Sequence, residues 1–323
     1  MLKSRFSNFA RKRIIPLLAK LIWKGAYFPG KTRFFRLITE NLVFAPGIAR
    51  HHAGFNWIID STHAQQMFLY SCEPFTSKVM STICTNSQYF VDIGANRGWY
   101  SVLLKSKNPS LKIYAFEPYP SIHSLLIENL EQFRGADPSI QTEEIALGSI
   151  NGRAILSTYL EGNDGMMTLF PQEEMKIQSQ RDVQVATLDR YFRSDIQIAD
   201  SYNKFRFLLK IDVEGSELDV VSGGKKFIEV LRPIIIMEIN LLLLASARTT
   251  SASIFEQMES FGYSSFWLDE RCKIVKVKDF NTPPHVKLLG SESGANYIFL
   301  PKDFGSISVG IEREFLPGFD WIL

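Results

Sequence analysis

The sequence Tyr89-Phe-Val-Asp-Ile-Gly-Ala-Asn-Arg-Gly-Trp-Tyr100 contains a strand, a glycine turn and the beginning of a helix. The run from Tyr89 to Ile93 is mostly apolar and stops at Gly94, and a helical pattern follows Gly98. A strand, a turn and a helix N-terminus in this order form a cradle for a nucleotide-like ligand. We expect glycine in this turn because a Cβ atom would collide with the ligand.

Asp92 places a carboxylate just before the turn and argues against a dinucleotide, whose pyrophosphate it would repel. The spacing is also Gly-x-x-x-Gly rather than the Gly-x-Gly-x-x-Gly of dinucleotide-binding turns. A cationic ligand without phosphate, such as S-adenosylmethionine, fits this pattern better. A glycine turn that binds no ligand stays open as the alternative.

A second acid follows the next predicted strand, residues 111–116. Glu117 lies about twenty residues beyond the glycine turn, where a carboxylate meets the ribose hydroxyls of a bound nucleoside. Pro118 ends the strand because it has no amide hydrogen for the sheet. The alternative is a solvated acid at a strand end.

The composition of the 323 residues is that of a globular protein, with 46% apolar residues and a net charge of +2. This charge is too small to indicate a nucleic-acid partner. The 3 cysteines exclude a full disulfide framework and fit a reducing compartment, so we expect a cytoplasmic protein. The histidines lack the spacing of metal ligands, and we expect no metal.

The N-terminal segment is basic: every charged side chain from Met1 to Thr39 is Lys or Arg. Apolar residues recur between these charges at helical spacing. Three interpretations stay open: a helix that lies peripherally on the inner membrane surface, a transit peptide, and a helix that packs on its own domain. The run from Ile14 to Trp23 is too short to span a membrane. We expect an extension over residues 1–60 and a main domain over residues 61–323.

Alternating strands and helices from about residue 85 to residue 300 predict an α/β fold with a largely parallel sheet. Helices are predicted over residues 74–84, 121–133 and 254–261, and short strands upstream over residues 55–59 and 67–70. Further strands are predicted over residues 140–147, 155–159, 183–185, 205–212, 233–240, 264–268 and 296–300, the last of them antiparallel. The predicted main domain carries acids at four strand ends: Asp92, Glu117, Asp212 and Glu238. The carboxyl ends of parallel strands meet at the ligand crevice, so we expect these acids to face it.

Six segments together resemble the FkbM family of S-adenosylmethionine-dependent methyltransferases, over roughly residues 65 to 300. They are Val91-Asp-Ile-Gly-Ala-Asn-Arg-Gly98, Ala115-Phe-Glu-Pro118, Ala146-Leu-Gly148, Thr187-Leu-Asp189, Lys210-Ile-Asp-Val-Glu-Gly215 and Arg232-Pro-Ile-Ile-Ile-Met-Glu238. Glu73-Pro74 also looks like the family's pattern. Two positions depart from it: Arg97 replaces a small or apolar residue, and Met166-Met167 replaces a serine-rich turn.

This resemblance implies a class I methyltransferase fold, Rossmann-like, with a mostly parallel seven-stranded sheet and helices on both faces. It implies methyl transfer from S-adenosylmethionine to a hydroxyl of a sugar, polysaccharide, lipid or natural product. We expect the cofactor to contact the glycine turn and the ends of the second and third strands, at Asp92, Gly94, Ala95, Asn96, Gly98, Glu117, Pro118 and Ala146.

A neutral hydroxyl is a poor nucleophile, so a base must remove its proton during the transfer, which contributes about 10²–10⁴ in rate. Glu214 or Asp212 is the expected base, and the other fixes the acceptor hydroxyl or the methionine ammonium. Asp212 alternatively caps the following helix. Asn163 and Glu238 are expected to contact the acceptor. Asp212, Glu238 and Asn240 also offer oxygen ligands for Mg²⁺ or Ca²⁺, although no metal is required.

Two other function classes stay open. One is a nucleotide-dependent oxidoreductase, which the missing third glycine and Asp92 argue against. The other is a non-catalytic scaffold with this fold at a membrane surface. The expected partner is a small-molecule or glycan acceptor with a free hydroxyl, and a homo-oligomer is left open.

Overall fold

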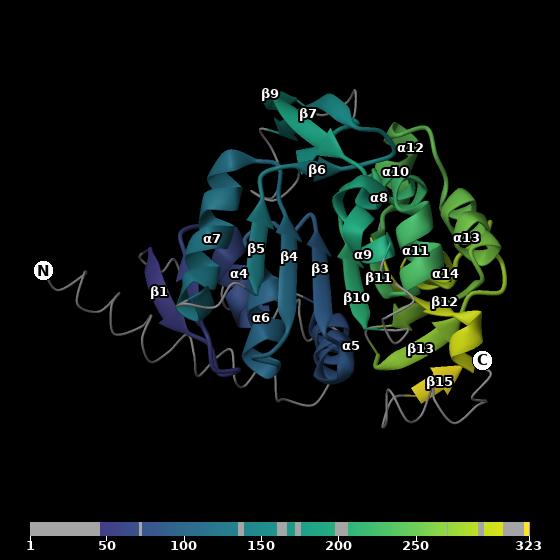
Figure 1. Ribbon diagram of the computed structural model, residues 1–323, viewed down its shortest axis with the longest axis horizontal. Coiled ribbons are helices and arrows are strands. Elements are labelled where there is room, and N and C mark those ends of the chain that lie inside the picture. The colour runs from purple at the N-terminus through teal and green to yellow at the C-terminus, as the bar shows by residue number, and fades with distance from the viewer. Residues whose placement is uncertain are drawn as a thin grey trace, which may run out of the picture.

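The computed structural model describes residues 46–70, 73–134, 139–159, 167–171, 176–197, 206–269, 271–289, 294–305 and 320–322. These residues build a 9-stranded sheet, helices on both of its faces and a 4-stranded sheet above one edge (Figure 1). The basic segment before residue 40 lies outside the described residues, so the predicted N-terminal helix stays a prediction.

The main sheet has the strand order β15-β13-β12-β14-β11-β10-β3-β4-β5. The parallel centre runs from β11 to β5, and β14 is antiparallel to both of its neighbours, as predicted. Two strands, β13 and β15, extend the predicted seven-stranded sheet at one edge. The bounds are β3 Tyr89–Ile93, β4 Lys112–Phe116, β5 Ile140–Glu143, β10 Phe207–Ile211, β11 Ile234–Ile239, β12 Tyr263–Asp269, β13 Lys273–Lys276, β14 Ala295–Pro301 and β15 Asp320–Ile322.

Two hydrophobic layers cover the faces of this sheet, because successive strand residues point to opposite sides. Phe90, Leu208 and Ile236 pack on the layer of α5 and α6, whereas Val91 and Leu209 pack on the layer of α10 and α11. The helices are α4 Thr62–Tyr70, α5 Pro74–Ile83, α6 Trp99–Lys107, α7 Pro120–Arg134, α8 Leu188–Tyr191, α9 Arg193–Gln197, α10 Glu217–Gly223, α11 Lys225–Leu231, α12 Leu241–Ser246, α13 Ser251–Ser260 and α14 Pro284–Leu289, with the 3₁₀ turns η2 Cys84–Asn86 and η4 Lys302–Gly305.

The small sheet lies above the carboxyl ends of β4 and β5 (Figure 1). Its strands are β6 Ala146–Leu147, β7 Gly152–Tyr159, β8 Met167–Thr168 and β9 Ile177–Ala186. The continuous strand predicted over residues 140–147 is wrong. It breaks after Glu143, because Ala146 and Leu147 pair with Val185 and Ala186 of β9 instead of continuing beside β4.

The described N-terminal part is a hairpin of β1 (Gly47–Arg50) and β2 (Asn56–Ile59), followed by α4. The strand predicted over residues 67–70 is wrong, since these residues complete α4. Ala64, Met67 and Phe68 are buried at helical spacing, and Trp57 Nε1 donates to the carbonyl of Ala64 at 3.0 Å. Within the residues that the structure describes, no helix is both long and apolar enough to cross a lipid bilayer.

Candidate functional site

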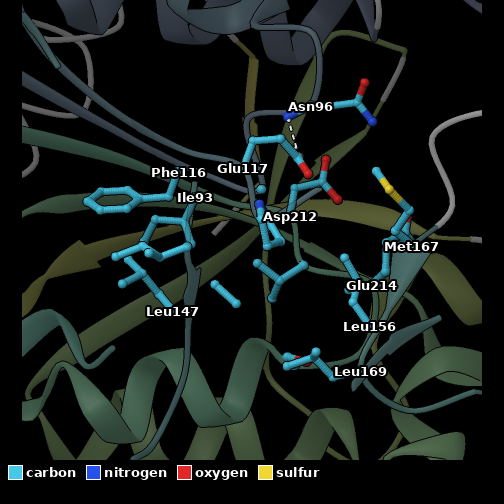
Figure 2. Close-up of a pocket in the computed structure, with 16 residues that line it drawn as sticks. Ile93, Asn96, Phe116, Glu117, Leu147, Leu156, Met167, Leu169, Asp212 and Glu214 are labelled. Carbon is cyan, nitrogen blue, oxygen red and sulfur yellow. Dashed lines mark hydrogen bonds between the residues drawn. The ribbon is translucent and has the colours of Figure 1, made fainter. Parts of the chain in front are cut away.

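A pocket opens at the carboxyl ends of β3, β4 and β10, under the small sheet (Figure 2). It encloses about 650 Å³ of space, part of it open to solvent. Its polar lining comes from the strand ends that the sequence singled out: Gly94, Asn96, Glu117, Asp212, Glu214 and Ser216. The remaining lining is apolar: Ile93, Phe116, Pro118, Val213 and, from the segment before β6 and the small sheet, Ile145, Ala146, Leu147, Leu156, Met167 and Leu169.

The glycine turn is required by contacts within the protein. Gly94 has φ +76°, and a Cβ atom there would lie 1.8 Å from the backbone oxygen of Asp212. Gly98 has φ +83°, and a Cβ atom there would lie 2.5 Å from a methyl carbon of Leu126 on α7. The expected reason for these glycines was collision with a ligand. The structure corrects it: the turn fits tightly between β10 and α7, and only glycine leaves room.

Glu117 joins the end of β4 to the glycine turn. Its Oε2 accepts the amide of Asn96 at 3.0 Å, and its Oε1 accepts the amide of Tyr119 at 2.9 Å. Burial raises the pKa of Glu117 to about 7. Each oxygen keeps a free lone pair, so the carboxylate can still accept hydrogen bonds from a ligand in the pocket.

Asp92 lies on the opposite side of β3 from where the sequence suggested. Its carboxylate is 2% exposed and accepts the hydroxyl of Ser101 on α6 at 2.6 Å. Burial raises the pKa of Asp92 to about 6. Asp92, Ala95 and Gly98 do not line the described part of the pocket, whereas Gly94, Asn96, Glu117, Pro118 and Ala146 do. The charge of Asp92 therefore gives no direct argument against a pyrophosphate.

Asp212 and Glu214 both line the pocket at the end of β10. Asp212 Oδ2 accepts the ammonium of Lys210 at 3.1 Å. Glu214 has φ +53°, and its backbone oxygen accepts the hydroxyl of Thr168 on β8 at 2.6 Å. Burial and, after it, the charge of Asp212 raise the pKa of Glu214 to about 8. This carboxyl can exchange a proton near neutral pH.

Further acids surround this pair; the sequence singled out Glu238 and Glu73, but sequence reasoning missed the donors that hold Glu73. The Glu73 carboxylate accepts the Tyr100 hydroxyl at 2.5 Å and the Asn296 side-chain amide at 2.6 Å. Glu238 does not line the described part of the pocket; the charge of Asp212, followed by burial, raises its pKa well above the usual range. Lys210 is 1% exposed, and a lysine inside an apolar strand was the signal for it.

The metal alternative finds no support at Asn240. Its side-chain oxygen accepts the amides of Leu242 at 3.1 Å and Leu243 at 3.5 Å, which caps α12. Among the described residues, no group of three or more His, Cys, Asp and Glu side chains is arranged to hold a metal ion. Asn163, the other expected acceptor contact, lies outside the described residues.

The comparisons with known proteins agree with the pattern of motifs. The family model of the methyltransferase FkbM domain matches residues 92–265. Methyltransferase sdnD of Sordaria araneosa is 31% identical over 159 residues, which are 43% of this chain and 61% of that protein. Methyltransferase 1 of Beauveria bassiana (strain ARSEF 2860) is 30% identical over 152 residues, 43% of this chain and 59% of that protein. The chain thus spans about three fifths of the length of these curated relatives.

Solved structures of similar proteins are more distant. The FkbM methyltransferase of Methylobacillus flagellatus KT has a TM-score of 0.39 at 14% identity, covering 74% of this chain and 55% of its own. The O-methyltransferase of Bacillus cereus in complex with SAH has a TM-score of 0.35 at 11% identity, covering 70% of this chain and 80% of its own. We therefore assign the fold of this chain from its own strand order and not from these solved structures.

Proposed function

Because this chain belongs to the family of the methyltransferase FkbM domain, we propose that it transfers a methyl group from S-adenosylmethionine to a hydroxyl oxygen. One observation carries the proposal. A single pocket is lined by Gly94 and Asn96 of the glycine turn, by Glu117, and by the pair of Asp212 and Glu214, although these groups come from three different strand ends. A binding group and a proton acceptor therefore face the same space.

The residues present suit this cofactor. Glu117 has two oxygens with remaining lone pairs for the ribose hydroxyls. Pro118, Ala146 and Leu147 contribute apolar surface to the lining of the same pocket, which suits an adenine ring. When bound, the cofactor supplies a methyl group on a positively charged sulfur. The carboxylates of Asp212 and Glu214 favour that positive charge.

Glu214 is the proposed general base. A carboxyl with a pKa near 8 is ionised in part at neutral pH and accepts a proton more strongly than an ordinary glutamate. Its backbone is held by Thr168, which limits the positions that the side chain can take. Asp212 is paired with Lys210 and better suited to holding the acceptor hydroxyl or the methionine ammonium.

The acceptor is proposed to carry its hydroxyl on a partly apolar body. Met167 on β8 and Leu169 just after it flank Thr168, and both line the pocket where the Thr168 hydroxyl donates to the backbone oxygen of Glu214. Leu156 on β7 extends this apolar wall. Among sugars, polysaccharides, lipids and natural products, such a wall favours acceptors with an apolar surface beside the hydroxyl.

Calorimetric titration of S-adenosylmethionine and S-adenosylhomocysteine tests the cofactor. We expect both to bind the wild type, and Glu117→Ala to lose affinity. Glu143→Ala is the matched control, because Glu143 ends the neighbouring strand and accepts the Tyr191 hydroxyl at 2.9 Å without lining the described pocket. A folded wild type that binds neither compound would refute the proposal.

A cofactor with a ¹³C-labelled methyl group, offered with a panel of alcohols, phenols and glycosides, tests the transfer. A labelled product whose methyl carbon has the chemical shift of a methyl ether is expected, and a methyl group on nitrogen or carbon would contradict transfer to oxygen.

Peripheral membrane contact through residues 1–39 stays a prediction. Flotation of the full chain with anionic vesicles, beside a chain that begins at residue 40 and keeps the hairpin, tests it; equal flotation of the two chains would contradict it.

A further inference from the structure

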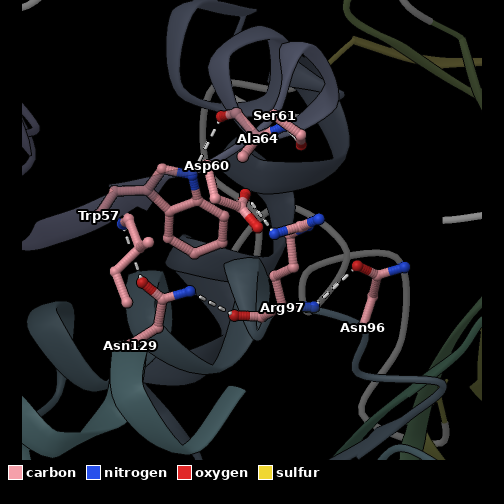
Figure 3. Close-up of polar contacts among 8 residues, drawn as sticks. Trp57, Asp60, Ser61, Ala64, Asn96, Arg97 and Asn129 are labelled. Carbon is pink, nitrogen blue, oxygen red and sulfur yellow. Dashed lines mark hydrogen bonds and ion pairs between the residues drawn. The ribbon is translucent and has the colours of Figure 1, made fainter. Parts of the chain in front are cut away.

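An ion pair between the buried Arg97 and the partly exposed Asp60 connects the glycine turn to the N-terminal hairpin (Figure 3). Arg97 lies between the two glycines of the turn and is 3% exposed. Its Nη1 donates to Oδ1 of Asp60 at 2.5 Å, and Asp60 directly follows β2. The two residues are separated by 37 positions in the sequence.

A second connection runs through Asn129 on α7, which is 2% exposed. Its side-chain oxygen accepts the amide of Ile58 on β2 at 3.0 Å, and its side-chain amide donates to the backbone oxygen of Arg97 at 2.9 Å. Figure 3 shows Asn129 between the end of β2 and the turn. The side chain and the backbone of Arg97 are therefore both held by the same end of β2.

The residue before Arg97 lies in the cofactor pocket. Asn96 has φ +50°, a conformation that non-glycine residues rarely adopt. Its side-chain oxygen accepts the amide of Arg97 at 2.8 Å, and its own amide donates to Glu117 Oε2 at 3.0 Å. A displacement of Arg97 therefore moves the residue that aligns Glu117.

The position of Arg97 depends on its partner. Within the described part of the chain, the Nε of Arg97 is buried and has no hydrogen-bond partner. Without the carboxylate of Asp60, a buried charge would remain unpaired, and the guanidinium would have to move toward water. The glycine turn would move with it, because Arg97 belongs to the turn.

We propose that the Asp60–Arg97 ion pair sets the position of the cofactor turn, so that Asp60 and Arg97 are positioning residues for the reaction. This inference rests on the proposed function, and it gives the N-terminal hairpin a role in cofactor binding.

The first test compares Asp60→Asn with Asp303→Asn. Asp303 forms a similar, partly buried ion pair with Arg232 at 2.8 Å, far from the turn in sequence and outside the pocket lining. We expect Asp60→Asn to weaken the binding of S-adenosylhomocysteine by about tenfold, within the range of coupling between linked sites. Asp303→Asn should change it by less than about twofold, as surface substitutions do. Equal affinities of wild type and Asp60→Asn would overturn the proposal.

A double variant separates positioning from stability. Replacing both partners by apolar residues removes the buried charge of Arg97 together with its counterion, so the double variant Asp60→Leu with Arg97→Met should melt close to the wild-type temperature. We expect its affinity for S-adenosylhomocysteine to remain about tenfold weaker, because the turn is no longer held. Recovery of affinity together with the melting temperature would show that the pair has only a structural role.

Hydrogen exchange gives a result that does not depend on the cofactor. In the free protein, amides of residues 93–98 should exchange faster in Asp60→Asn than in the wild type and in Asp303→Asn. Unchanged exchange would overturn the inference. If the wild type fails to bind S-adenosylhomocysteine, the proposed function fails, and this measurement still decides whether the ion pair holds the turn.

Discussion

The stability of Glu117→Gln relative to the wild type should rise toward alkaline pH, and its binding of cofactor should weaken. Glu117 is 3% exposed, and burial raises its pKa from an ordinary 4.5 to about 7. The folded protein therefore binds a proton more tightly at this site than the unfolded chain does. Glutamine resembles the neutral carboxyl and cannot ionise, so the variant avoids the cost of a buried charge.

The sign and size follow from the two pKa values. Because the folded pKa is the higher one, stability falls as the pH rises from about 4.5 through about 7. At about 1.4 kcal/mol for each pH unit between the values, the full difference is about 3 kcal/mol. Between pH 5 and pH 8, the free energy of unfolding of Glu117→Gln should rise by about 2–3 kcal/mol relative to the wild type.

Urea denaturation of both proteins at pH 5 and pH 8 measures this difference. In the variant, the glutamine NH₂ would face the backbone amide of Asn96 or Tyr119. This contact lowers the stability of the variant by the same amount at both pH values, so it cancels when the two stability differences are compared. Glu143→Gln, with the matched side chain at the next strand end, serves as the control. The same stability difference at both pH values would refute the reasoning. Titration with S-adenosylhomocysteine should show weaker binding to Glu117→Gln at pH 8.

Two further predictions concern the turn and the base. Gly94→Ala should destabilise the protein by about 1–3 kcal/mol more than Gly54→Ala in urea denaturation. Both glycines have positive φ, but only at Gly94 would the new Cβ atom meet a backbone oxygen, that of Asp212, at 1.8 Å; equal losses would contradict the contact. Wild-type kcat should rise with pH up to about 8, since the proposed base Glu214 acts when ionised. Glu214→Gln should lower kcat by about 10²–10⁴ and remove this rise in a pH–rate profile; an unchanged profile would exclude Glu214 as the base.

Local patterns in the sequence are sufficient to predict the parallel centre of the sheet and most of one wall of the pocket. The strand Tyr89–Ile93 has the predicted bounds, because an apolar run that ends in glycine has few other ways to fold. Glu117, Asp212 and Glu214 line the pocket because parallel strands bring their carboxyl ends to one edge. The strand bounds and the placement of these acids depend only on neighbouring residues and on the repeated order of strand and helix, both of which can be seen in the sequence.

Packing between distant segments decides the rest. Asp92 shares its side of β3 with Phe90, and the sheet turns that side toward α6 rather than toward the pocket. Glu73 meets Asn296 across 223 positions, and Asp60 meets Arg97 across 37. Such pairs leave no periodic signal along the chain, because their partners become neighbours only when separate elements pack together. A side chain's distance from the pocket is set by that packing, whereas the strand that carries it is set by its own residues.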